Sequence, residues 1–157
     1  MERHREGFSL VEILIVVLIL GILAMVVVPK FASSSYDAKD AALSTDLKSV
    51  RRQIELYTQQ HRSRGPEVDE MGQLETTNFA NRLTRRTTPE GALDDTGPRG
   101  PYLSEWPSNP FVDATVAQTI TFGKGTVSPR NGTSGWYFSI QTRQIYVNSK
   151  EGAESVN

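Results

Sequence analysis

Gly7-Phe8-Ser9-Leu10-Val11-Glu12 leads directly into an apolar segment that ends at Val28. Apart from one serine and one glycine, Glu12 is the only residue from Phe8 to Val28 that is not apolar. As an α-helix, about 20 residues at 1.5 Å each cover the roughly 30 Å of a bilayer core, so this stretch predicts a membrane-spanning helix. A carboxylate at the bilayer centre costs about 2.5–3.5 kcal/mol, and less toward the edge. Glu12 therefore needs a partner or a function.

The composition argues against an enzyme. The chain has 157 residues, enough for one membrane helix and one small domain, and its formal net charge of −1 gives no bulk attraction to nucleic acid. It contains no cysteine and only two histidines, His4 and His61. Disulfides, thiolate metal sites and a cysteine nucleophile are thereby excluded. Since no nucleophile–base pair or metal-ligand constellation is visible either, we expect no catalytic residues, no resident cofactor or metal and no nucleic-acid partner.

The start of the chain has three interpretations. A secretory signal peptide would have an apolar core of about 7–15 residues and a small-x-small cleavage site, and this segment is longer and has no such site. An ordinary membrane anchor fits the length but leaves Glu12 without a purpose. The third interpretation is a leader, residues 1–7, that is removed on the cytoplasmic side of the apolar segment.

The run from Gly7 to Glu12, followed by an unbroken apolar helix, resembles the N-terminal signature of type IV pilins and type II secretion pseudopilins. The resemblance implies that a prepilin peptidase cuts between Gly7 and Phe8 and methylates the new N-terminus of Phe8. It also implies that Glu12 takes part in filament assembly. Pro29 lies where many members of the family have a proline, and a proline there can kink the helix.

Charge gives a physical reason for that role of Glu12. Cleavage would leave a positive amine on Phe8, and a carboxylate about 4 Å away would attract it by about 4 kcal/mol at an effective dielectric of 20. Such a pair would remove two charges from lipid together. It can form within one subunit or between two, and the sequence leaves both open.

The charges on either side of the apolar segment predict its orientation. Two arginines precede it, whereas Lys30 and Lys39 after it are balanced by Asp37 and Asp40. The positive-inside rule therefore places the N-terminus in the cytoplasm and the rest of the chain outside. With the resemblance, this predicts a single-pass protein of the bacterial inner membrane with a periplasmic head.

Beyond Pro29 the pattern becomes that of an amphipathic helix. Apolar residues recur at spacings of seven, four, three, four and three. They are Tyr36, Leu43, Leu47, Val50, Ile54 and Tyr57. We expect this helix to end near residues 61–64, because Gly65-Pro66 stops a helix, and to pack against a small sheet as in pilin-like proteins.

Residues 66–113 are rich in proline, glycine and threonine and predict a loop region. One short helix is expected over residues 76–86, capped by Thr76 or Thr77, with its three arginines at a solvated end. Asp95-Thr96-Gly97 spells the aspartic protease tripeptide, but the chain has no second copy, so we interpret it as a turn. The run from Gly100 to Phe111 is similar to a segment of the major pseudopilin of type II secretion.

Three alternating runs, residues 119–122, 136–140 and 144–147, predict a small antiparallel sheet within residues 118–148. The last two form a hairpin through Gln141-Thr142-Arg143, and residues 149–157 form a flexible tail. Major pseudopilins often bind calcium in an acidic loop of this region. The corresponding residues here, 128–134, contain no carboxylate, so calcium is implied by the resemblance and not by the residues.

Together these features predict an α+β, pilin-like protein with a leader (1–7), an apolar helix (8–29) and a periplasmic head (30–157). The expected function is that of a structural subunit of a type II secretion pseudopilus. The implied partners are copies of itself, minor pseudopilins, the prepilin peptidase, the inner-membrane assembly platform and the lipid bilayer. A type IV pilus subunit for adhesion, motility or DNA uptake is the first alternative. A membrane-tethered binding domain that never polymerises is the second.

Overall fold

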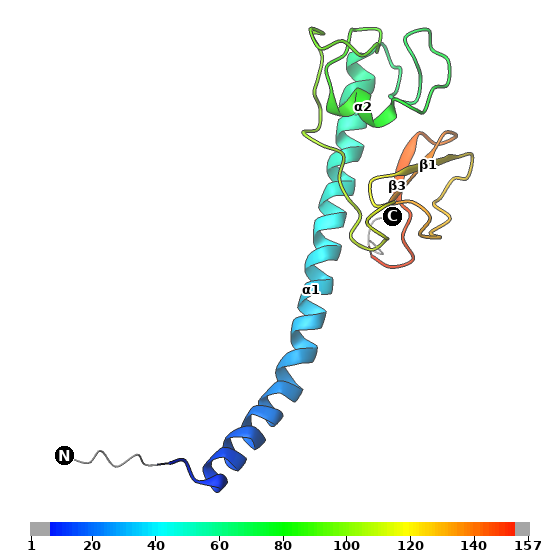
Figure 1. The fold of residues 1–157 in the computed structure, drawn as a ribbon. Coiled ribbons are helices and arrows are strands. Elements are labelled where there is room, and N and C mark those ends of the chain that lie inside the picture. The colour runs from blue at the N-terminus through cyan, green and yellow to red at the C-terminus, as the bar shows by residue number, and fades with distance from the viewer. Residues whose placement is uncertain (1–6, 153–157) are drawn as a thin grey trace, which may run out of the picture. The chain divides into compact units, whose positions relative to one another are not determined.

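The computed structural model describes residues 7–152. Most of the expected leader (1–6) and the end of the expected tail (153–157) lie outside the described residues. In chain order the elements are α1 (Leu10–Gln60), α2 (Phe79–Thr84), β1 (Ile120–Gly123), β2 (Trp136–Ser139) and β3 (Gln144–Val147), as shown in Figure 1. The chain divides into two compact units, residues 1–38 and 39–157, and α1 contributes to both.

Helix α1 has 51 residues, and its end at Gln60 agrees with the predicted stop before Gly65-Pro66. Pro29 lies inside this helix, and the helical assignment continues on both sides of it. Because proline has no N–H, the carbonyl of Met25 lacks its usual partner four residues later. The predicted kink at Pro29 stays a prediction.

In the second unit, one face of α1 contributes five of the twelve described residues that form the buried core. Leu43 and Val50 have no exposed surface, and Tyr57 is 1% exposed. They pack against residues of α2 and the sheet, chiefly Phe79, Leu83, Trp136, Phe138 and Ile145. The predicted stripe is thus confirmed from Leu43 to Tyr57. Tyr36, its first member, belongs to the first unit and is 42% exposed.

The sheet has the order β1-β2-β3 and is mixed, which corrects the prediction of an antiparallel sheet. The pair β2–β3 is antiparallel, as expected of the hairpin, but β1 pairs with β2 in parallel, with Ile120 opposite Trp136. A parallel pair needs a connection of about a dozen residues, and the glycine-rich segment between β1 and β2 has that length. All four residues of the central strand β2 are buried.

The expected helix over residues 76–86 is shorter in the structure. It begins at Phe79, and Asn78 at the N-cap position makes no side-chain capping bond, so the predicted caps Thr76 and Thr77 are wrong. A reason lies in Glu75, whose carboxylate accepts a hydrogen bond from the backbone N–H of Asn78 at 3.1 Å. That carboxylate takes over a donor that a threonine cap would otherwise satisfy.

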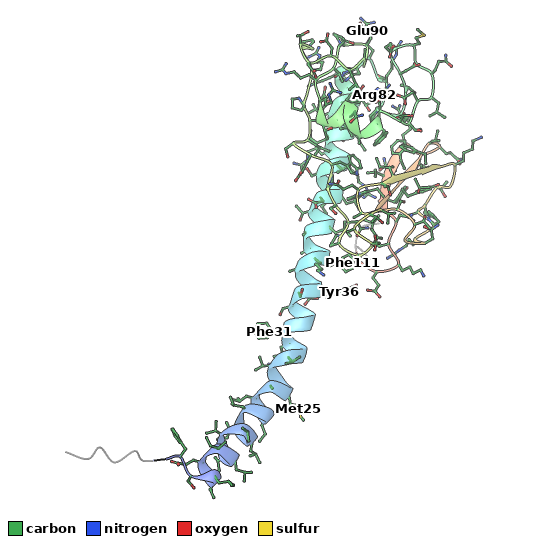
Figure 2. The ribbon with its side chains drawn as sticks, in the orientation of Figure 1. Met25, Phe31, Tyr36, Arg82, Glu90 and Phe111 are labelled. Carbon is green, nitrogen blue, oxygen red and sulfur yellow. The ribbon has the colours of Figure 1, made fainter. Side chains whose placement is uncertain are left out.

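Arg82 corrects the prediction of a solvated arginine cluster. It is 3% exposed, and its guanidinium donates to the carbonyls of Pro66, Glu75 and Gly91 at 3.0–3.2 Å. It also pairs with the Glu75 carboxylate at 2.7 Å. Its side chain, labelled in Figure 2, therefore links the loop segments that contain these three carbonyls.

Candidate functional site

The described residues before α1, residues 7–9, are open to solvent. The position that a Cβ atom would take on Gly7 has no neighbour within 4 Å, and Phe8 is 84% exposed. The bond between Gly7 and Phe8 is therefore not covered by described parts of the chain. A peptidase acting there would find an accessible backbone that belongs to no helix or strand.

Ser9 and Glu12 form a capping box at the start of α1. The Glu12 carboxylate accepts a hydrogen bond from the backbone N–H of Ser9 at 2.9 Å, and the Ser9 hydroxyl accepts one from the N–H of Val11 at 3.4 Å. Two of the backbone donors that a helix start leaves without partners are satisfied in this way. Negative charge in the first turn is also favourable to the helix dipole.

Glu12 thus has a role within its own chain that the sequence analysis missed. The signal was present, because serine followed three residues later by glutamate is the pattern of a capping box. The prediction for Glu12 used only the cost of a charge in an apolar segment and not its spacing from Ser9. Ser9 belongs to the site together with the predicted residues Gly7, Phe8 and Glu12.

The first unit exposes its apolar side chains on every side of the helix. Every residue from Leu10 to Met25 is exposed, and the described large apolar side chains between Leu10 and Val28 are 43–80% exposed. In Figure 2, Met25 and Phe31 project outward from α1. An ordinary helix of a globular protein buries one stripe, and this segment buries none within its unit.

We predicted a membrane span from Phe8 to Val28. Within residues 7–152, no helix of the structure combines the length and the apolar character that crossing a membrane requires.

The protease-like tripeptide is a turn, as predicted. The Asp94 carboxylate accepts hydrogen bonds from the N–H and the hydroxyl of Thr96, at 2.8 and 2.7 Å, and Asp95 pairs with Arg85 at 2.8 Å. These bonds lower the pKa of Asp94. The two aspartates thus stabilise a loop.

The segment from Gly100 to Phe111 packs on the core. The backbone N–H groups of Tyr102 and Leu103 both donate to the carbonyl of Leu83, at 2.8 and 2.9 Å. Trp106 is buried against Phe79 and Trp136. This segment holds α2 against the sheet and has a structural role.

Comparisons with known proteins point to the start of the chain and then to the head. The family model of the prokaryotic N-terminal methylation motif matches residues 3–28, which include Gly7, Phe8, Ser9 and Glu12. No solved structure matches the chain.

Three curated relatives carry the same name, type II secretion system core protein G. The protein of Pseudomonas aeruginosa is 42% identical over 36% of this chain and 39% of its own length. The protein of Dickeya chrysanthemi is 30% identical over 71% of this chain and 66% of its own length. The protein of Klebsiella pneumoniae is 30% identical over 68% of this chain and 74% of its own length. Since these matches extend well beyond the methylation motif, the chain belongs to the family of the type II secretion system core protein G.

Proposed function

We propose that this chain is the precursor of a structural subunit of a type II secretion pseudopilus. Its leader is removed between Gly7 and Phe8 and the new N-terminus is methylated. Copies then polymerise through the N-terminal part of α1, together with minor pseudopilins, on an inner-membrane assembly platform. The filament supports the passage of secreted proteins across the outer membrane. The family and the methylation motif support this proposal.

The main observation that supports the proposal is the exposed apolar surface of α1 between Leu10 and Val28. Burying one leucine, isoleucine or valine side chain contributes about 1.5–3 kcal/mol, and residues 10–28 hold more than a dozen of them. Such a helix is covered either by lipid or by identical helices. We propose both in sequence: the inner membrane, with the N-terminus in the cytoplasm and the head in the periplasm, and then the filament core.

Glu12 can have a partner both in the membrane and in the filament. In the single chain its carboxylate accepts a bond from Ser9, which lowers the cost of taking the charge into an apolar medium. In a filament the amine of a cleaved Phe8, from the same or a neighbouring copy, is a second partner. The proposal assigns Glu12 to assembly and leaves the peptidase reaction to the backbone at Gly7 and Phe8.

Mass spectrometry of the membrane form tests processing. Removal of seven residues from 157 leaves 150, and the mature chain is expected to begin at N-methylated Phe8. An intact leader in cells that contain a prepilin peptidase would contradict the proposal and favour a tethered domain that does not polymerise.

Filament yield tests assembly. Glu12→Ala is expected to be cleaved and methylated normally but to give few sheared filaments on immunoblots. Glu70→Ala is the matched control, because it removes an exposed carboxylate from the head, and it should assemble as the unchanged chain does. Equal filament yields from Glu12→Ala and the unchanged chain would refute the role of Glu12.

A further inference from the structure

The segment that follows β3 is fastened into the head. Asn148 and Ser149, which directly follow β3, have no exposed surface. Gly132 donates its backbone N–H to the Asn148 carbonyl at 2.8 Å, and Asn148 donates its own to the Gly135 carbonyl at 3.1 Å. The loop of residues 128–135 and the segment of residues 148–152 are therefore one unit of structure.

The Asn148 side chain is the centre of this junction. Its Oδ1 accepts a bond from the Ser128 hydroxyl at 3.0 Å and one from the backbone N–H of Asn131 at 3.4 Å. Its Nδ2 donates to Asn131 Oδ1 at 3.0 Å and to the Ser134 hydroxyl at 2.9 Å. Both ends of a buried amide are thus satisfied by the loop.

Arg130 supplies a positive charge to the same junction. Its Nε donates to the carbonyl of Ser149 at 3.3 Å and its Nη2 to the carbonyl of Gly152 at 3.2 Å. Its backbone has a φ of 49°, in the left-handed region that non-glycine residues seldom adopt, and its N–H donates to the Ser128 hydroxyl at 3.2 Å. The left-handed turn at Arg130 belongs to the same hydrogen-bonded junction.

A calcium ion would need a different set of donors here. Calcium binds six to eight oxygens at about 2.3–2.6 Å, usually with carboxylates among them. In this junction the carbonyls of Ser149 and Gly152 and the amide oxygens of Asn131 and Asn148 already accept hydrogen bonds. The loop of residues 128–134 offers no carboxylate, and the guanidinium would repel a second cation. The residues present do not fit calcium.

We infer that Arg130, although its side chain is partly open to solvent, is a built-in cation that closes the C-terminal end of the head, as a bound divalent ion closes an acidic loop. The guanidinium donates hydrogen bonds to two backbone carbonyls of residues 148–152. The side-chain amides of Asn148 and Asn131 hold the loop of residues 128–135 next to it. Closure of this end of the head is then independent of metal ions. This inference concerns the head alone and holds whether or not the chain polymerises.

Thermal unfolding of the full chain in detergent tests the inference. The Tm of the unchanged chain is expected to be the same in excess EDTA and in millimolar calcium chloride. Arg130→Ala should lower Tm by about 3–6 °C, and calcium should not restore it. Arg52→Ala is the matched control, since Arg52 is an exposed arginine of α1, and its Tm should stay close to that of the unchanged chain.

A second measurement keeps the test decisive if Arg130→Ala folds poorly. Arg130→Lys keeps the charge but loses the two-pronged donor, so hydrogen exchange of the peptide that contains Asn148 should be faster in this variant while exchange in α1 is unchanged. Calcium that raises Tm or gives saturable heat in a titration would overturn the inference. So would an Arg130→Ala chain whose Tm matches that of Arg52→Ala.

Discussion

At the scale of single residues, Glu12 has two separable properties. Its carboxylate shape allows it to cap the helix start, and its charge allows it to pair with an amine. Glutamine keeps the first property, because it also completes a capping box, and loses the second. Alanine at Ser9 does the reverse, since it removes the hydroxyl that caps Val11 and leaves the Glu12 charge in place.

This separation gives a prediction for two variants. Ser9→Ala is expected to destabilise the helix start by about 0.5–2 kcal/mol, seen as faster hydrogen exchange of the amides of residues 10–13 in detergent, with filaments still formed. Glu12→Gln should keep slow exchange there and lose filaments. If Glu12→Gln assembled normally, capping and not charge would be the function of Glu12.

His61 predicts a pH dependence of stability. It has no exposed surface, its Nδ1 lies 2.8 Å from the carbonyl of Tyr57, and its Nε2 lies 2.9 Å from the Thr87 hydroxyl. Burial lowers the pKa of His61 in the folded head, and the nearby Arg99 lowers it further while Glu90 opposes the change. The unfolded chain therefore binds a proton more readily than the folded one, and stability is lost as pH falls below about 6.5.

The measurement is Tm at a series of pH values between about 7.5 and 5.5, where the unfolded histidine titrates. The unchanged chain should lose stability across this range. His61→Phe should have a lower Tm at pH 7.5, because Thr87 loses its partner, but a flatter dependence on pH. Equal slopes for the two chains would mean that other groups cause the dependence.

At the scale of elements, α1 is one helix with two kinds of surface. Residues 43–57 bury a stripe against α2 and the sheet, whereas residues 10–25 expose their apolar side chains on all sides. The two parts therefore respond differently to the same truncation of a side chain.

Leu47→Ala and Ile19→Ala test this difference. Leu47 is 2% exposed, so its loss should destabilise the head by about 2–5 kcal/mol in denaturant unfolding followed by tryptophan fluorescence. Ile19 is 50% exposed, and its replacement should leave head unfolding unchanged while it reduces filament yield. A loss of head stability in Ile19→Ala would show that the apolar part of α1 supports the head.

The elements were predictable where the pattern is periodic. The helix and its buried stripe follow from repeated spacings, and the strands follow from alternation, so both were found to within a few residues. The parallel pairing of β1 with β2 was missed because alternation gives no strand direction. The buried Arg82 was missed because its partners are mainly backbone carbonyls of three loops. Every residue has such a carbonyl, so the sequence does not indicate which ones will lie near this arginine. Ser9 was missed although its spacing to Glu12 was visible.

At the scale of the whole molecule, the two units of the chain differ in where their apolar side chains lie. The first unit exposes them along α1, and the second buries its aromatic and aliphatic residues in one core. Within residues 39–152, that core and the junction at Arg130 are built from the chain's own side chains. The comparisons cover more than the first unit, because the family model of the methylation motif matches residues 3–28 and the match to the Dickeya chrysanthemi relative covers 71% of the chain.

The hydrogen bond from Arg51 Nε to the carbonyl of Ile145, at 3.1 Å, joins residues 94 positions apart. Around it, the helix stripe packs on β2 and β3, which are synthesised long after α1. The head therefore cannot complete its core until β3 has been made. The apolar residues 10–28 leave the ribosome long before that moment. Biogenesis of this protein must therefore shelter its first helix while most of the head has yet to be made.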